Sequence, residues 1–313
     1  MFAHGLAADL RPAFPKPYRA DSTAHIFRMV SMPSPRPPLH PARLLRLSGI
    51  ALLAVGCTDA PTPDGDAGVS VPAASSPNTI VQHLAAGHPV FGVFSGAMTR
   101  EQGAAIVETR DADFVLYSME TGPFDVPGMQ EYLAGMADGA AARGVTAQPV
   151  LLRTPPIHTD AEGTRAQVAE ALAAGVDGIV FPHMTSGEEA ALSVEFLAGD
   201  EAGLWPGVAH GELLDVLIIE DQEGIAHARD IMATPGLSIV FAGPGDLRRA
   251  YDGDMEAVEN AIQTVLAACK EFDVPCGVTA GVADIAGRLE EGFRVIIVTE
   301  PDALAVGRAA AGR

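Results

Sequence analysis

From Asn78 onward, short apolar runs rich in Val, Ile and Phe alternate with Ala-rich stretches of helical character. This alternation indicates consecutive βα units and a parallel sheet, because parallel strand pairs need a long crossover connection, usually a helix. Eight such runs fall within about 240 residues, the usual size of a (β/α)8 barrel. They begin at Pro89, Asp113, Gln148, Asp177, Leu214, Ser238, Pro275 and Phe293. The sequence therefore predicts an α/β fold, a (β/α)8 TIM barrel over residues 78–313.

Helix signals between the runs agree with this fold. Thr99 with Gln102 is typical of a helix start, and "TSGEEAALSVEFL" predicts a capped helix after the fourth run. The main rival is a doubly wound open sheet. No GxGxxG motif follows the first run, so nothing favours a dinucleotide-binding fold.

The segment before the barrel divides into two parts. Residues 1–57 end in "RLLRLSGIALLAVGC", in which arginines precede a short apolar stretch and small residues precede the cysteine. This order is typical of a secretory signal, and the apolar core is too short to span a bilayer. The segment resembles a bacterial lipoprotein signal, which implies that Cys57 is the lipidated first residue of the mature chain. Residues 58–77 are predicted to be a flexible Pro/Ala/Ser/Asp tether with nothing to bury.

Localisation depends on this leader. If it is a signal, we expect a protein anchored by lipid in the cell envelope of a bacterium and facing the periplasm. The alternative is a disordered, arginine-containing leader with an incidental apolar run, which would leave the protein in the cytoplasm.

Charge is distributed unevenly along the chain. Residues 1–56 hold seven basic and two acidic residues, a net charge of +5, so the remainder carries −25 given the total of −20. A body this acidic repels nucleic acid and anionic lipid. We therefore expect no nucleic-acid partner, and membrane contact only through a lipid anchor.

Cysteine and lysine usage exclude two kinds of chemistry. Three cysteines do not make a disulfide framework, and no pair has zinc-finger spacing. Of the two lysines, Lys16 lies in the leader and Lys270 lies near a predicted helix end before a strand. That is the wrong end of a barrel for catalysis, so a Schiff-base mechanism is excluded and carbonyl chemistry has to be metal-assisted.

Polar residues cluster where the apolar runs end, which is where the active site of such a barrel lies. Two acids on different strands can share a hard divalent cation, and an arginine nearby can hold a substrate carboxylate. The glycine turn "GPGD" adds backbone N–H groups that can face an anion. A single acid at a strand end is more often a helix cap or an ion-pair partner. The prediction of an active site therefore rests on the joint placement of the acids, the arginine and the glycine turn. The residues are Glu120, Thr121, Arg153, His183, Glu220, Gly243 to Asp246, Thr279 and Glu300.

Five segments have the order and approximate spacing of one known family. They are "DFVLYSMETGPFD", "QPVLLRTP", "AGVDGIVFPHMTSGEEA", "LIIEDQEGIAHARDI" and "IVFAGPGDL". From about Asn78 to Arg308 the chain resembles the HpcH/HpaI aldolase family, related to the citrate lyase β subunit, and "IE…GP.DL" is the most specific part. The resemblance implies a phosphoenolpyruvate/pyruvate-type barrel, commonly hexameric, that cleaves or forms a carbon–carbon bond next to a pyruvate enolate.

The resemblance also implies roles for individual residues. Glu220 and Asp246 match the two acids that bind Mg²⁺, Mn²⁺ or Co²⁺. Arg153 matches the arginine that steadies pyruvate or its enolate, and Gly245 lies in the turn that contacts the substrate carboxylate. The implied partners are small 2-oxo acids such as pyruvate or oxaloacetate, and further copies of the chain in a homo-oligomer.

The residues at the end of the second predicted strand depart from the family's pattern. The family reads D-x-E-H-G-P, whereas here Ser118 replaces the aspartate and Thr121 replaces the histidine assigned to proton transfer. Ala173 stands where an aspartate orients that histidine, while Glu120 is kept. The stretch between the fourth and fifth runs, residues 196–215, is short and lacks the family's arginine- and glycine-rich loop.

Three hypotheses follow. In the first, the protein is a metal-dependent lyase in which Arg153 and Glu120 act with His183, the best placed of His158, His183 and His210, while Thr121 binds substrate. In the second, it is a catalytically impaired, lipid-anchored barrel that binds metal and a small oxo acid without turnover. In the third, the barrel is only an assembly unit and binds no metal.

Overall fold

A closed parallel barrel forms the core of the protein. The computed structural model describes residues 78–199, 203–208 and 210–313. Within them, eight strands close the barrel: each pairs in parallel with the next, β4 pairs with β6, and β9 pairs with β1. This confirms the predicted (β/α)8 barrel. The strands are β1 (Val90–Phe94), β2 (Phe114–Ser118), β3 (Val150–Arg153), β4 (Gly178–Phe181), β5 (Leu204–Trp205), β6 (Leu213–Ile219), β7 (Ile239–Ala242), β8 (Cys276–Ala280) and β9 (Val295–Val298).

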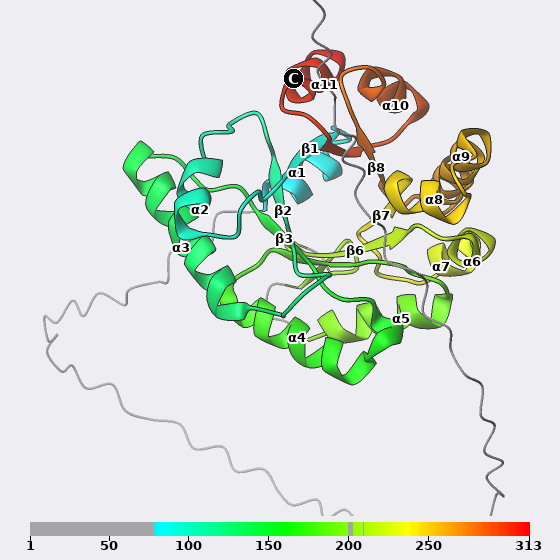
Figure 1. Cartoon of the computed structure of the whole chain (residues 1–313), viewed down its shortest axis with the longest axis horizontal. Coiled ribbons are helices and arrows are strands. Elements are labelled where there is room, and N and C mark those ends of the chain that lie inside the picture. Colours follow the sequence, from blue (N-terminus) through cyan, green and yellow to red (C-terminus); the bar gives the residue numbers. More distant parts are fainter. Residues whose placement is uncertain (1–77, 200–202, 209) are drawn as a thin grey trace, which may run out of the picture. The chain divides into compact units, whose positions relative to one another are not determined.

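Helices surround the strands in Figure 1. The predicted caps are present: Thr99 accepts a hydrogen bond from the N–H of Gln102, and Ser186 accepts one from the N–H of Glu189. The helices are α1 (Thr79–Ala85), α2 (Arg100–Ile106), α3 (Val126–Arg143), α4 (Ala161–Ala174), α5 (Gly187–Leu197), α6 (Gln222–Ala226), α7 (Ala228–Met232), α8 (Pro244–Ala250), α9 (Met255–Phe272), α10 (Ile285–Glu291) and α11 (Asp302–Ala310), with a 3-10 turn at Ile157–Thr159.

Each predicted strand is present, and one short strand was not predicted. The two residues of β5 pair with the start of β6, Leu204 opposite Leu213 and Trp205 opposite Leu214. A two-residue strand is too short to produce an alternating pattern, so the sequence carries no signal for it. It pairs only with β6 and is not one of the eight strands that close the barrel.

Two hydrophobic cores hold the barrel together. The outer core lies between strands and helices, and the inner core fills the barrel with side chains such as Leu116, Val216 and Phe241. Ile80 and Leu84 of α1 belong to the inner core and are almost completely buried. Helix α1 therefore closes the end of the barrel from which the strands start.

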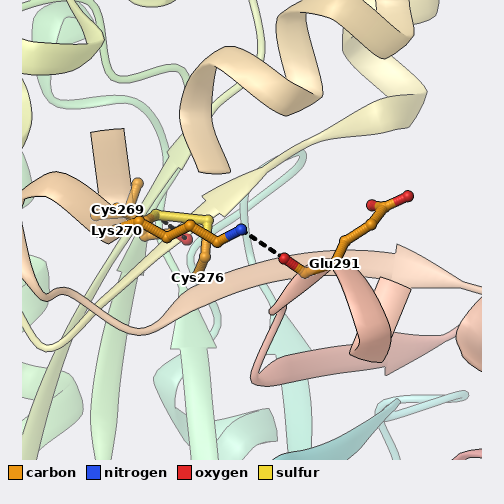
Figure 2. The surroundings of a disulfide bond; sticks show 5 residues. Cys269, Lys270, Cys276 and Glu291 are labelled. Atoms are coloured by element: carbon orange, nitrogen blue, oxygen red, sulfur yellow. Dashed lines mark hydrogen bonds between the residues drawn. A yellow bond between two sulfur atoms is a disulfide. The ribbon is translucent and has the colours of Figure 1, made fainter. Parts of the chain in front are cut away.

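A disulfide that was not predicted lies at this amino-terminal end. It joins Cys269 near the end of α9 to Cys276 at the start of β8, with the Cα atoms 5.7 Å apart (Figure 2). The adjacent Lys270 donates a hydrogen bond of 2.6 Å from Nζ to the carbonyl oxygen of Glu291. Lys270 thus lies at the end of the barrel opposite the carboxyl ends of the strands, as expected from the sequence.

Among the described residues, no helix is both long and apolar enough to cross a membrane. The predicted leader with Cys57 (residues 1–57) and the predicted tether (58–77) lie outside the residues that the structure describes.

Candidate active site at the carboxyl ends of the strands

A cavity of about 280 Å³ opens at the carboxyl ends of the strands. Apolar and polar side chains both line it, and several predicted site residues contribute. Its lining residues are Phe94, Leu116, Arg153, Ile218, Glu220, Phe241, Ala242, Gly243, Pro244, Gly245, Asp246, Thr279, Ile297 and Thr299. The structure therefore brings Arg153, Glu220, Gly245 and Asp246 to one cavity.

Glu220 is the most buried acid of this cavity. It follows β6 directly, and only 3% of its side chain is exposed. The backbone N–H of His183 donates to its Oε1 at 3.2 Å, and His183 Nε2 lies 3.8 Å from the same oxygen. Burial raises the pKa of Glu220, against the favourable effect of His183. A carboxylate in this position is stabilised by a cation that replaces the lost water.

Gly243 makes the position of Glu220 possible. A Cβ atom at Gly243 would lie 2.5 Å from Glu220 Oε2 and 2.7 Å from Glu220 Cβ. Both distances are shorter than those at which a Cβ atom approaches a non-bonded atom. At Gly245, to which the family resemblance assigns the substrate contact, a Cβ atom would meet nothing within 4 Å. The repeated glycine of "GPGD" was the available signal, but only the neighbouring strand shows which glycine is needed for packing.

A chain of polar contacts joins the ends of β2, β3 and β4. Arg153 Nη2 lies 2.9 Å from Glu120 Oε2, and Arg153 Nε donates to Ser118 Oγ at 2.9 Å. The other oxygen of Glu120, Oε1, lies 3.4 Å from His183 Nε2. The contact with His183 lowers the pKa of Glu120, with Arg153 acting in the same direction against burial. The same contact raises the pKa of His183, which favours the protonated imidazole.

His183 has a backbone conformation that is unusual for a residue with a side chain. Its φ is 51°, in the left-handed region, at the turn that follows β4. Such a conformation costs on the order of 1 kcal/mol or more and persists only where the surrounding contacts enforce it. Here the His183 N–H bonds to Glu220 and the imidazole faces Glu120. The turn thus aims both hydrogen-bonding groups of one residue at two acids of the site.

Asp246 lies in the first turn of α8, beside Gly245. Its side chain is 25% exposed, and Oδ1 accepts a hydrogen bond from Nη2 of Arg249, three residues further along the helix. Gly243 caps this helix without a side-chain hydrogen bond. The first-turn N–H groups of α8 therefore lack a capping side chain.

Other residues considered in the sequence take no part in these contacts. Thr121 is exposed in the loop after β2. His158 Nδ1 is 3.7 Å from Glu189 Oε1, and His210 is exposed with a φ of 65°. Ala173 is exposed on α4. Of the three histidines considered, only His183 contacts the acids of the cavity.

The donor atoms at this site suit a divalent cation. One ligand atom each from Glu120, His183 and Glu220 can be chosen so that all three lie within 4.8 Å of one another. Carboxylates suit Mg²⁺ and Mn²⁺, whereas an imidazole suits transition-metal ions. Asp246, which was predicted to pair with Glu220, lines the same cavity but lies outside this three-residue group. The buried Glu220 carboxylate is common to both possible ligand sets.

Comparisons with known proteins identify the family of this chain. The family model described as HpcH/HpaI aldolase/citrate lyase matches residues 91–299. The hydroxypyruvate/pyruvate aldolase of Delftia acidovorans (strain DSM 14801 / SPH-1) is 28% identical over 237 residues, covering 67% of this chain and 81% of that protein.

Solved structures show the same fold. A HpcH/HpaI aldolase/citrate lyase family protein from Burkholderia cenocepacia J2315 superposes with a TM-score of 0.60 at 24% identity, covering 74% of this chain and 96% of that one. The citrate lyase β subunit complexed with oxaloacetate and magnesium from M. tuberculosis superposes with a TM-score of 0.52 at 18% identity, covering 72% and 98%.

Proposed function

Because this chain belongs to the HpcH/HpaI aldolase/citrate lyase family and is thus an enzyme of the aldolase and lyase type, we propose that it is a divalent-metal-dependent carbon–carbon lyase. The proposed substrates are small 2-oxo acids related to pyruvate and oxaloacetate, cleaved through a pyruvate enolate. The observation that carries the proposal is the buried Glu220 carboxylate, which shares a cavity with Arg153 and contacts His183.

Glu220 and Asp246 are the proposed metal ligands, with Glu120 close enough to contribute. Mg²⁺, Mn²⁺ or Co²⁺ bound there would polarise the ketone of a 2-oxo acid and favour its enolate. Glu220 holds its place because Gly243 leaves room for the carboxylate and the His183 N–H bonds to it.

Arg153 is positioned to bind the anionic part of the substrate. Its Nε and Nη2 are held by Ser118 and Glu120, whereas Nη1 has no hydrogen-bond or ion-pair partner among the described residues. The guanidinium is therefore fixed in direction with one nitrogen available to the substrate. Positive charge at this point stabilises the enolate as it forms.

His183 is the proposed proton carrier in place of the histidine that Thr121 replaces. In the cleavage direction, neutral imidazole takes the proton from the C4 hydroxyl of a 4-hydroxy-2-oxo acid. The C3–C4 bond breaks, its electron pair passes to the enolate, and C4 leaves as an aldehyde. The imidazolium then returns the proton to C3, which completes pyruvate. Glu120 stabilises the protonated imidazole between the two transfers.

Gly245 and Thr121 are assigned supporting roles. Gly245 lines the cavity in the first turn of α8, where backbone N–H groups can hold a substrate carboxylate. Thr121 is exposed beside Glu120, so we assign its hydroxyl to the rim of the substrate site.

A metal- and oxo-acid-binding protein without turnover is the second candidate. It is favoured by Ser118 and Thr121, which replace the proton-transfer machinery, and by the engagement of His183 with Glu120. Loss of general acid–base help costs about 10²- to 10⁴-fold in rate, so the two candidates differ in turnover and not in binding.

The deciding experiment measures Mn²⁺ binding by calorimetry and deuterium exchange at C3 of pyruvate by NMR. The lyase predicts Mn²⁺-dependent exchange and oxaloacetate decarboxylation, both abolished by Glu220→Ala and retained in Glu223→Ala, which changes an exposed acid on α6. Mn²⁺ and pyruvate binding without exchange would establish the binding protein instead. Absence of Mn²⁺ binding would exclude both.

We also propose that the protein is exported and anchored through a lipid on Cys57. The Cys269–Cys276 disulfide supports this, because disulfides persist in oxidising compartments such as the periplasm. Labelling of cells with radioactive palmitate should mark the wild type and not Cys57→Ala. Recovery of the protein without palmitate label in the soluble cytoplasmic fraction would contradict export.

Assembly into a homo-oligomer is a further part of the proposal. It rests on family resemblance, and light scattering coupled to size-exclusion chromatography measures it directly. A mass of one chain at micromolar concentration would contradict it.

A further inference from the structure

A second cavity, of about 270 Å³, lies at the amino-terminal end of the barrel. Its wall comes from the start of α1, from α3, and from the segments that lead into β3 and β4. It is nearly as large as the cavity of about 280 Å³ at the carboxyl ends of the strands. None of the described residues lines both cavities, so a ligand of the second cavity would bind apart from the proposed lyase site.

Asp177 is the only charged residue among the described residues that line this second cavity. It lies directly before β4, and its Oδ2 accepts a hydrogen bond of 2.8 Å from the N–H of Val150. Its other oxygen, Oδ1, has no hydrogen-bond or ion-pair partner within the described part of the chain. Burial raises the pKa of Asp177 to about 6 from the usual 3.8, the Val150 N–H opposes this, and the charge of Glu212 adds to it. A carboxylate in these surroundings is stabilised by a cation from solution.

Gln148, in the wall of the same cavity, lacks a hydrogen-bond donor. Only 8% of the residue is exposed, and its Nε2 donates to the carbonyl oxygen of Thr109 at 2.9 Å. Its Oε1 is buried and accepts no hydrogen bond from the described residues. Buried polar atoms normally have a partner, and an N–H donor that enters the cavity would supply one. Asp177 and Gln148 therefore both lack a donor, and Asp177 also lacks a positive charge.

The rest of the cavity wall is largely apolar. On α3, Leu133, Met136 and Ala137 are spaced three and four residues apart and share one face of the helix. Ala147 and Pro149, in the segment before β3, add further apolar surface. A ligand of this cavity therefore has a hydrocarbon part as well as a cationic group. It is also small, because drug-sized ligands occupy pockets of about 300–1,000 Å³.

The polar groups of the wall determine which kind of cation fits. Ca²⁺ takes about six to eight oxygen ligands and Mg²⁺ a near-octahedral shell, whereas the cavity offers one carboxylate, one amide oxygen and the hydroxyls of Thr79 and Thr146. A guanidinium binds a carboxylate best through two parallel hydrogen bonds, and one oxygen of Asp177 is already bonded to Val150. A primary ammonium carries three donors on one nitrogen, which suits a set of separate acceptors.

We propose that this cavity binds a small primary alkylammonium ion, with its nitrogen at Asp177 and Gln148 and its hydrocarbon part against α3. The proposal does not depend on the proposed lyase activity, because the two cavities share no described residue.

The first test measures binding of 3-methylbutylammonium to the intact chain by calorimetry. Concentrations up to about 10 mM cover the weak affinity of a ligand with few atoms. The matched ligands are 3-methylbutanol, which is uncharged, and 3-methylbutanoate, which has the opposite charge. The ammonium should bind at least about tenfold more tightly than either, as expected for a hydrogen bond between charged groups. Absence of saturable binding, or equal binding of the alcohol, would overturn the proposal.

The second test removes the charge of Asp177. Asp177→Asn keeps an oxygen for the Val150 N–H, and it should weaken binding of the ammonium about tenfold or more without changing that of the alcohol. Glu170→Gln is the matched control, because it removes an exposed acid from α4, the helix that precedes Asp177. Equal losses in the two variants would show a general charge effect and contradict a site at Asp177.

The third test fills the cavity and leaves the acid in place. Ala137 is exposed on α3 and lines the cavity, so Ala137→Leu can fold and should abolish ammonium binding. Ala141→Leu adds the same side chain one turn further along the helix, outside the cavity lining, and should bind as the wild type does. This pair decides the question if Asp177→Asn does not fold. Unchanged binding in Ala137→Leu would mean that the ammonium binds elsewhere.

The outcomes separate this proposal from the lyase proposal. Mn²⁺ affinity and pyruvate exchange should keep their wild-type values in all four variants. Failure of ammonium binding with intact pyruvate exchange would overturn the second site and leave the lyase. Ammonium binding that requires Asp177, without Mn²⁺-dependent exchange, would overturn the lyase and leave the second site.

Discussion

Two buried carboxylates at opposite ends of the barrel have very different surroundings. Asp113, before β2, is 6% exposed and contacts Arg308 at 2.8 Å, Arg313 at 2.9 Å and the backbone N–H of Phe91 at 2.8 Å. Glu220, after β6, is 3% exposed and has one backbone N–H and the imidazole of His183 at 3.8 Å.

The difference separates an acid with a structural role from the acid of the proposed metal site. Asp113 has its counter-charges within the fold and joins α11 to the start of the barrel. Glu220 is buried as deeply but lacks a permanent cation, which suits a site that takes one from solution. Stability is concentrated at one end of such a barrel and chemistry at the other.

Removing Asp113 should give the largest effect on stability. Asp113→Ala leaves the partly buried Arg308 and Arg313 without their counter-charge, which costs roughly 3–5 kcal/mol of unfolding free energy. Urea unfolding measures the loss, and Mn²⁺ affinity of the folded protein should stay at the wild-type value. Asp111→Ala is the control, because Asp111 is 68% exposed and lies 3.9 Å from Arg308. If the two variants lost equal stability, the structural role of Asp113 would be wrong.

Gly243→Ala should impair metal binding at the other end of the barrel. The added Cβ atom displaces the Glu220 carboxylate, so Mn²⁺ affinity and pyruvate exchange should fall roughly 10- to 100-fold, as for loss of a group that orients a metal ligand. Gly245→Ala adds the same methyl group to the same turn where nothing lies within 4 Å. Calorimetry should therefore show a much smaller loss of Mn²⁺ affinity for Gly245→Ala, and comparable losses would contradict the packing argument.

The disulfide offers a third test at the amino-terminal end. Replacing Cys269 and Cys276 together by Ala should lower the unfolding free energy by about 2 kcal/mol, since the closed loop is short. Metal binding at the other end should not change. Wild-type protein in reducing agent should approach the stability of the double variant, and the variant itself should not respond. A wild type that ignored reductant would show that the disulfide is absent or without effect on stability.

The smallest effect, taken per pH unit, concerns the pH dependence of stability. Asp215 on β6 is completely buried beside Ser193 Oγ at 2.8 Å, and burial raises its pKa to about 8 from the usual 3.8. The folded state therefore keeps a proton that the unfolded state loses, so unfolding free energy falls as pH rises from about 4 to about 8.

Asp215→Asn tests this dependence. Between pH 6 and pH 7 it should remove a slope of about 1 kcal/mol per pH unit, with little change near pH 4. Chemical unfolding across this pH range provides the measurement. Glu290→Gln, an exposed acid on α10, should keep the wild-type slope. An unchanged slope in Asp215→Asn would mean that Asp215 ionises normally in the folded protein.

Much of the fold and part of the site could be predicted from local pattern. The eight barrel strands follow from short apolar runs separated by capped helices, and the strand ends identify Arg153, Glu220 and Asp246 as cavity residues. His183 was chosen among three histidines by its position after a run, and the structure places it between Glu120 and Glu220. These features depend on neighbouring residues along the chain, which a sequence displays directly.

Other features depend on contacts between distant segments. The requirement for Gly243 arises from the Glu220 side chain of the adjacent strand. The Cys269–Cys276 disulfide forms because the chain reverses between α9 and β8. None of these has a signature in residue spacing alone.

The sequence by itself determined the barrel and the end at which its polar residues gather, because hydrophobic periodicity and strand polarity are local properties. Only the tertiary structure decided which acid received permanent counter-charges. Asp113 and Glu220 both adjoin apolar strands in the sequence. Barrel closure brings Arg308 of α11, and Arg313 after that helix, to Asp113, and leaves Glu220 facing a cavity. The charge balance of a buried acid is set by groups distant along the chain, and these meet it only after folding.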